Sequence, residues 1–294
     1  MPLEFPWPVP PGFSQSPVWT GGGFRIGDLV VPVLAYETGA SGWSDSLTSF
    51  HEQHAGPDHF IDRASRQHAL EQLDRHLRVA SPVILEIGCS SGFMLRSVRE
   101  HLPNAFLIGS DYVRGPLEKL AAEMTDLPLL QFDLVRCPLP DNGIDAVILL
   151  NVLEHIQDDV TAARQIHRIL KPGGVAVIEV PAGPRLYDVY DKLLLHCRRY
   201  SLKDLKRLVE GAGFLTVDQS HLGCFMYPGF WAVKQRNKRF LSRQGAEPGH
   251  VVARNIHETG ASRVLGAVMR WELTLGRWIS YPFGIRCLLT CVKV

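Results

Sequence analysis

Apolar and polar positions follow two different rhythms through the middle of this 294-residue chain. Short runs that are apolar almost throughout are typical of buried parallel strands, and they lie at 83–87, 105–108, 127–132, 144–150 and 175–180. Apolar residues recur at helical spacing between and beside these runs, at 62–78, 93–101, 116–124, 160–170 and 202–211. Strands that alternate with helices in this way predict a doubly wound α/β fold, with a parallel sheet covered by helices on both faces.

The chain divides into four stretches of different composition. Residues 1–56 are rich in Pro, Gly, Trp and Ser, which predicts a loop-dominated N-terminal extension with one short extended run at 28–36. Residues 57–223 hold the alternating strands and helices of a core domain. Residues 224–280 are more basic and aromatic and predict a helical insertion, and residues 281–294 predict a final strand of the core sheet.

A tight turn follows the first of the core strands. It reads Gly88-Cys89-Ser90-Ser91-Gly92. Glycine is needed where the backbone takes unusual dihedral angles or approaches a ligand closely, and ligands of open α/β sheets bind beyond the carboxyl ends of the strands. The turn therefore predicts a small-molecule site at this edge of the sheet.

Polar side chains stand at the tips of the next three strands. Asp111 ends the second strand, 23 residues after Gly88, where a carboxylate can accept hydrogen bonds from both hydroxyls of a ribose. Asp133 ends the third strand, where a carboxylate can accept a hydrogen bond from an adenine amino group, and Asn151 ends the fourth. These placements predict a cofactor that contains a nucleoside.

The spacing of the turn separates the classes of nucleotide cofactor. The dinucleotide fingerprint G-x-G-x-x-G is absent, and no lysine follows as a P-loop requires. Glu86, which precedes the turn, would repel a pyrophosphate. It suits a cofactor that carries cations, such as the sulfonium and ammonium groups of S-adenosylmethionine.

Several segments taken together resemble the class I, seven-stranded methyltransferases, and most closely the small-molecule branch that includes ubiquinone-type O-methyltransferases. They are LEIGCSSG, the acidic tip Asp111, LPDNGIDAVILLNVLEHI and LKPGGVAVIEVP, and the resemblance covers residues 60–223. It implies a Rossmann-like seven-stranded sheet with an antiparallel last strand, S-adenosylmethionine as the cofactor, and methyl transfer to a small or a lipid- or sugar-linked acceptor, with oxygen as the favoured atom.

The resemblance also implies roles for single residues. In the family the turn approaches the methionine part of the cofactor, the first acidic tip binds its ribose and the second lies near adenine. An E-x-x-E-H motif holds a divalent metal in some relatives, but Asn151 replaces its first glutamate here, so we expect no bound metal ion. Ser90 also replaces the usual middle glycine of the turn. The implied cofactor-binding residues are Glu86, Gly88, Cys89, Gly92, Asp111, Tyr112, Asp133, Leu134 and Asn151.

Methyl transfer to an alcohol or phenol needs a general base, and histidine titrates closest to neutral pH. His155 follows the fourth strand tip and is the first candidate, with pocket shaping as its alternative role. His196 is the second candidate. It opens the segment HCRRYS, which together with LVEGAGF resembles the H-x-R-R-Y-S…AGF region of many uncharacterised bacterial methyltransferases.

Residues that contact the acceptor are expected from two regions. Helices inserted before the last strand help to shape the acceptor pocket in this family, so residues 224–280 are expected to cap the substrate. Residues 43–66 are expected to form a lid, since His51 and His54 match no standard metal-site spacing. The arginines of HCRRYS could instead bind nearby carboxylates. The predicted acceptor-binding residues are His59, Arg63, Tyr190, Arg198 and Tyr200.

Composition and charge restrict the partners. The net charge is +1, which does not suggest a nucleic-acid partner. Six cysteines without a CxxC pair predict free thiols in a reducing, cytoplasmic compartment, and neither a signal peptide nor a membrane-spanning segment is expected. Residues 231–243 are basic and aromatic, a pattern compatible with a solvated helix face, with weak contact with a membrane surface or with a phosphate-bearing substrate.

Other functions remain open at the level of the sequence. A non-catalytic module that binds an adenosyl ligand would keep the same strand tips. An N- or C-methyltransferase, or a methyltransferase that acts on RNA or protein, would share the cofactor site. An oxidoreductase on a Rossmann sheet is disfavoured by the spacing of the turn.

Overall fold

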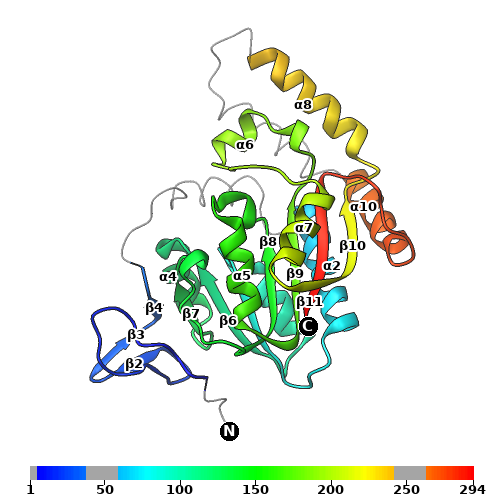
Figure 1. Ribbon diagram of the computed structural model, residues 1–294. Helices are drawn as coiled ribbons and strands as arrows, with labels where there is room; N and C mark the ends of the chain where they lie inside the picture. Colours follow the sequence, from blue (N-terminus) through cyan, green and yellow to red (C-terminus); the bar gives the residue numbers. More distant parts are fainter. Residues whose placement is uncertain (1–4, 38–58, 242–262) are drawn as a thin grey trace.

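The computed structural model describes residues 5–37, 59–241 and 263–294 (Figure 1). Its central sheet has the strand order β10-β11-β9-β8-β5-β6-β7-β4. All pairings are parallel except those of β11 with β9 and β10, so β11 alone runs against the other strands. The strands are β4 (Val33–Ala35), β5 (Val83–Ile87), β6 (Phe106–Asp111), β7 (Leu129–Gln131), β8 (Ile144–Leu150), β9 (Leu170–Pro181), β10 (Phe214–Leu222) and β11 (Arg286–Lys293).

The predicted fold class is confirmed, with one correction to the number of strands. The sheet has eight strands instead of seven because β4 pairs with the edge strand β7, with Val33 opposite Leu129. The extended run predicted at 28–36 is divided at Pro32 into β3 (Leu29–Val31) and β4. Proline has no backbone N–H and is rarely found inside a sheet ladder, so it separates the two strands.

Helices cover both faces of the sheet. α2 (Phe60–His76), α3 (Phe93–His101) and α4 (Arg114–Glu123) pack on one face, and α5 (Asp159–Ile169) and α7 (Leu202–Gly211) pack on the other. The two faces have separate apolar clusters because successive side chains of a strand point to opposite sides. In β5, for example, Leu85 belongs to the cluster with α5 and Ile84 to the cluster with α2.

The described part of the N-terminal extension contains short strands where its composition predicted loops. β1 (Val18–Trp19), β2 (Phe24–Ile26) and β3 form a small antiparallel sheet. Trp7 and Phe24 are buried against each other, edge to face, with 4.9 Å between their ring centroids. This aromatic contact joins the small sheet to the core cluster, so residues 5–37 form a packed part of the fold.

Two longer helices lie between β10 and β11. They are α8 (Tyr227–Leu241) and α10 (Arg263–Gly276), and Figure 1 shows α8 projecting beyond the sheet, above the short helix α6 (Val189–Leu193). None of the described helices is long and apolar enough to cross a bilayer. All six cysteines are free thiols, as predicted.

Candidate active site

The turn after β5 needs glycine at both ends. Gly88 has a φ of 76°, and a Cβ atom there would stand 2.5 Å from Cγ2 of Val152. Gly92 has a φ of 73° and precedes the first residue of α3. The N–H groups of Gly88 and Cys89 both donate to the carbonyl of Ser110, at 2.8 and 2.9 Å, and so tie the turn to β6. The predicted turn is thus held against the tip of the neighbouring strand.

Asp111 binds this turn from the end of β6. Its Oδ2 accepts a hydrogen bond from the N–H of Ser90 at 3.0 Å, and its Oδ1 accepts one from the N–H of Val113 at 2.9 Å. Tyr112, which follows it, is half-buried. The carboxylate is therefore fixed by two amides at the sheet edge, where carboxylate oxygens can accept further bonds from a diol.

Glu86 is buried below the same turn. Its side chain is 6% exposed, and its Oε2 has no hydrogen-bond partner among the described residues. Burial raises its pKa well above the usual value, and the neighbouring charge of Asp111 raises it further. Burial also raises the pKa of the Cys89 thiol, which is a neutral packing group. A buried carboxyl group with an open oxygen suits a ligand that brings a donor or a cation.

The other strand tips have local roles as well. Asp133 accepts a hydrogen bond from the N–H of Val135 and caps the short helix η1 (Leu134–Arg136), whose Leu134 is buried. Asn151 takes a left-handed φ of 57°, and its amide donates to Oε1 of Glu179 at 3.2 Å. These contacts orient the tips of β7 and β8 but leave their predicted cofactor roles as predictions.

The two candidate bases lie together. The rings of His155 and His196 meet edge to face, with 4.7 Å between centroids. His155 ends the short helix η2 (Leu153–His155), and the N–H of Cys197 donates to the carbonyl of Glu154 at 2.7 Å. This backbone hydrogen bond holds the two segments next to each other, although they are about 40 residues apart in the sequence.

Glu154 completes this group. One donor atom each from Glu154, His155 and His196 lie within 4.8 Å of one another, a spacing that a metal ion could bridge. Glu154 is fully buried, and apart from its own amide no described group binds its carboxyl oxygens. Burial raises its pKa to about 8, so the group is largely protonated at neutral pH. The expected absence of a bound metal stays a prediction.

His196 is oriented by a buried carboxylate. Its Nδ1 lies 3.0 Å from Oδ1 of Asp191, which also accepts a hydrogen bond from Nε of Arg199 at 2.7 Å. Burial alone would raise the pKa of Asp191, but the hydrogen bond from His196 and the nearby cations outweigh it and hold the pKa well below its usual value. With Nδ1 bound in this way, Nε2 is the ring atom that remains for a substrate.

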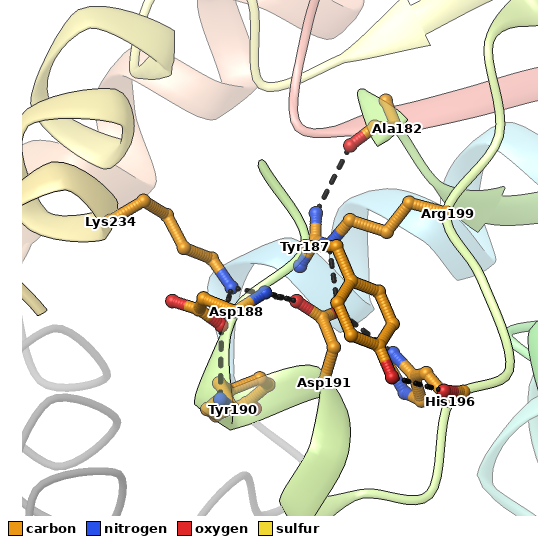
Figure 2. A network of polar contacts seen from close by, with 8 residues as sticks. All are labelled: Ala182, Tyr187, Asp188, Tyr190, Asp191, His196, Arg199 and Lys234. Atoms are coloured by element: carbon orange, nitrogen blue, oxygen red, sulfur yellow. Dashed lines mark hydrogen bonds and ion pairs between the residues drawn. The ribbon is translucent and has the colours of Figure 1, made fainter. Parts of the chain in front are cut away.

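Figure 2 shows the buried network around this carboxylate. Nζ of Lys234 in α8 lies 2.7 Å from Oδ1 of Asp188 and 3.2 Å from Oδ2 of Asp191. Arg199 also donates to the carbonyl of Ala182 at 3.0 Å, and the hydroxyl of Tyr187 donates to the carbonyl of His196 at 2.7 Å. The network joins α8, α6 and the loop that carries His196 into one unit.

The predicted acceptor-binding residues fall in different surroundings. Nδ1 of His59 lies 3.6 Å from Oδ2 of Asp62, and its ring stacks on Phe60. Arg63 is exposed. Tyr190 lies under the ammonium of Lys234, 5.1 Å from its ring centroid.

Arg198 and Tyr200, the other two predicted acceptor-binding residues, both bind the carboxylate of Asp159. Arg198 forms an ion pair with Asp159, and the hydroxyl of Tyr200 donates to the same side chain at 2.7 Å. Tyr200 is buried. These contacts are the alternative role that the sequence left open for this segment. His51 and His54 lie outside the described residues.

A second polar cluster was not predicted from the sequence. Arg286 in β11 lies 2.5 Å from Oε1 of Glu179 at the tip of β9 and 2.8 Å from Oδ1 of Asp62 in α2. Ser65 donates to the same Glu179 oxygen at 2.9 Å. The cluster draws on α2, β9 and β11, whose contributing residues are more than 100 positions apart in the chain, and no local motif marks them. Because Asn151 also binds Glu179, the cluster reaches the strand tips of the site.

Comparisons with known proteins identify proteins similar to this chain. Residues 85–178 match the family described as a methyltransferase domain. A probable S-adenosylmethionine-dependent methyltransferase of Mycolicibacterium smegmatis is 28% identical over 54% of this chain and 62% of its own length. The ubiquinone biosynthesis O-methyltransferase of Ruegeria pomeroyi is 27% identical over 53% of this chain and 65% of its own length.

A solved structure extends the similarity beyond the matched residues. The S-adenosylmethionine-dependent methyltransferase from Mesorhizobium loti superposes with a TM-score of 0.52 and 16% identity, covering 79% of this chain and all of that one. At this identity the likeness shows the fold alone. The chain spans less than two thirds of the length of the two curated relatives.

Proposed function

We propose that this chain, as a class I methyltransferase, transfers a methyl group from S-adenosylmethionine to an oxygen atom of its acceptor. The acceptor is a small molecule or a molecule linked to a lipid or a sugar. The observation that carries the proposal is the contact between Asp111 and the glycine turn. One carboxylate fixes the turn and stands at the tip of β6, where it would position the cofactor and the turn together.

The described residues fit this cofactor. Glu86 offers an open carboxyl oxygen under the turn, where the cationic methionine end would lie. Asp111 offers carboxylate oxygens at the place where the ribose would lie. Asp133 and Leu134 flank the expected adenine position at the next strand tip. When bound, S-adenosylmethionine supplies an electrophilic methyl group on a sulfonium whose product is neutral.

The choice of oxygen as the attacked atom rests on the histidine pair. An alcohol or phenol must lose a proton as it is methylated, and general bases contribute about 100- to 10,000-fold to such steps. His196 is held by Asp191 with Nε2 available, and His155 packs against it. Burial of both His196 and Asp191 keeps this pair away from bulk water, which strengthens its electrostatic interactions.

Calorimetric titration with S-adenosylmethionine and with S-adenosylhomocysteine tests the cofactor site. Wild type should bind both ligands, and Asp111→Ala should weaken binding at least tenfold because it removes the carboxylate that fixes the turn. Asp126→Ala is the matched control. Asp126 is an exposed aspartate that pairs with Arg99 on the surface, and its removal should leave the affinity unchanged.

The outcomes separate the alternatives. Binding lost only in Asp111→Ala supports the cofactor and its site and justifies a screen of phenolic and alcoholic acceptors. Folded wild type that binds neither ligand would contradict the proposal. Binding without turnover of any acceptor would instead favour a non-catalytic adenosyl-binding module.

A further inference from the structure

One side of α10 carries an apolar stripe that faces away from the protein. Val264, Val268, Trp271 and Leu275 follow one another at spacings of four, three and four residues, which places them on one face of the helix. Val264 is 71% exposed, Trp271 70% and Leu275 40%. An apolar stripe at this spacing normally packs against a core, so its exposure on this helix needs an explanation.

The opposite side of α10 is fixed against the core by a carboxylate. Met269 is 2% exposed, and the fully buried Glu272 accepts hydrogen bonds from three successive backbone amides. These amides belong to Gly223, Cys224 and Phe225, at 2.5, 3.0 and 3.1 Å. The helix cannot turn its apolar stripe inward without breaking these bonds and leaving three backbone amides without their acceptor. Its outward orientation is therefore built into the fold.

The segments on either side of α10 in the chain carry further exposed apolar residues. The segment after α10 adds Trp278 and Ile279, which are 87% and 52% exposed, and α8 with its preceding turn adds Trp231 and Phe225, 49% and 50% exposed. A groove of about 680 Å³ lies between Phe225 and the residues Val264, Ala267, Val268 and Trp271 of α10. We call Phe225, Trp231, Val264, Trp271, Trp278 and Ile279 the aromatic surface. Figure 1 shows α8, which carries Trp231, and α10, which carries Val264 and Trp271.

The charge of this part of the chain is opposite to that of the rest. Residues 224–294 contain 11 Lys and Arg against three Asp and Glu, whereas residues 1–223 contain 20 against 27. Glu272 is the single acidic residue among the described residues of 224–294, and it is buried. Arg236, Arg270 and Arg277 are exposed there, and Arg277 also pairs with Glu71 of α2 at 2.6 Å. Exposed tryptophans among arginines, without exposed acids, are the composition of proteins that lie on anionic membranes.

We propose that the aromatic surface docks on the face of an anionic lipid bilayer. The other candidate occupants fit less well. Residues 242–262 contain no Phe, Trp or Tyr, and their only large apolar residues are Val251, Val252 and Ile256, so they offer little apolar area to cover this surface. A second copy would bring two strongly positive regions together, which like-charge repulsion opposes. This inference goes beyond methyl transfer and does not depend on it.

The aromatic surface is connected to the candidate site through α8. Trp231 stands three residues from Lys234 in α8, and Lys234 binds the same Asp191 that orients His196. Docking through Trp231 would therefore bring α8, and with it the loop of His196, close to the lipid surface.

Co-sedimentation with lipid vesicles tests the proposal on the full chain. We expect binding to vesicles in which about a third of the phosphatidylcholine is replaced by phosphatidylglycerol, weak binding to phosphatidylcholine alone, and a decrease with added salt. The double variant Trp271→Ser/Trp278→Ser should bind at least tenfold more weakly, because it removes the two most exposed aromatic side chains. Leu215→Ser/Val160→Ser, which removes exposed apolar residues from β10 and α5, should bind like wild type.

Two further measurements keep the test decisive. Thermal unfolding and titration with S-adenosylmethionine, both without vesicles, should be the same for wild type and the tryptophan variant, which separates a docking defect from a folding or cofactor defect. Wild-type protein that binds neither kind of vesicle would overturn the proposal. So would a dimer in solution that the tryptophan variant abolishes, or salt-sensitive binding that the variant leaves unchanged.

Discussion

Nδ1 of His196 lies 3.0 Å from Oδ1 of Asp191, and both side chains are almost completely buried. The ring of His196 also contacts that of His155. A carboxylate that binds Nδ1 fixes the tautomer and orientation of the ring and stabilises the imidazolium that forms when Nε2 takes a proton. The sequence favoured His155 as the base, and the structure shows that a buried carboxylate orients His196.

Replacement of His196 separates the two candidates. We expect His196→Gln to lower turnover of a hydroxylated acceptor about 100-fold or more and to leave the affinity for S-adenosylmethionine unchanged. His155→Gln should cost less. Nitrogen-15 NMR of the wild-type side chain should show the neutral ring protonated at Nδ1, which reports the contact with Asp191 independently of turnover. A larger loss in His155→Gln would reverse the assignment.

Gly88 and Gly173 provide a matched pair of substitutions. Both have a positive φ, 76° and 78°, but a Cβ at Gly88 would meet Val152 at 2.5 Å whereas one at Gly173 would meet nothing within 4 Å. Gly173→Ala should therefore cost about 1 kcal/mol of unfolding free energy from backbone strain, and Gly88→Ala about 3 kcal/mol from strain and overlap. Denaturant titration measures both. Addition of Val152→Ala should recover part of the loss at Gly88 and none at Gly173.

Glu154 should make stability depend on pH. The pKa of its carboxyl group is 4.5 in the unfolded chain and about 8 in the folded one. Between these values the native state holds a proton that the unfolded state has lost, so stability falls as pH rises, by at most about 5 kcal/mol. Thermal unfolding between about pH 5 and about pH 8 in EDTA should show the full slope in wild type and in the exposed control Glu100→Gln. The slope should be smaller in Glu154→Gln, where the raised pKa of Glu86 still contributes. Equal slopes in all three would contradict the assignment.

Lys234 should hold α8 in place. Its removal leaves Asp188 and Asp191 buried with one cation fewer, and breaking a buried pair on one side costs about 3–5 kcal/mol. We expect Lys234→Ala to lower the melting temperature and to make α8 sensitive to limited proteolysis. Arg236→Ala, at an exposed position of the same helix, should change neither. Proteolysis that is equally slow in both variants would mean that other contacts fix the helix.

Removal of metal ions tests the group of Glu154, His155 and His196. A protonated carboxyl is a poor ligand, because metal binding requires the deprotonated form. We therefore expect dialysis against EDTA to leave both cofactor affinity and turnover unchanged, and elemental analysis to find no stoichiometric metal. A bound divalent ion at this group would overturn this expectation and would also abolish the pH slope predicted for Glu154.

Local periodicity was sufficient for the elements of the core. β5, β8, α3 and α7 have the bounds that the sequence predicts, because each is defined by its own apolar spacing and by the turns that flank it. The glycine turn and Asp111 were predicted for the same reason, since they stand at fixed positions relative to these strands. Boundaries shifted where the pattern was weaker, as at β9, which begins at Leu170 instead of Val175.

The amino-acid sequence by itself therefore determined the fold class and the edge of the sheet that carries the candidate site, because both follow from short-range patterns. Tertiary structure decided which distant side chains meet there: Asp191 with His196, Lys234 with Asp188, and Arg286 with Glu179. It also decided that β4 extends the sheet and that the apolar stripe of α10 points outward. These features depend on strand order and helix orientation, which are set by the packing of the whole chain and leave no local signal in its sequence.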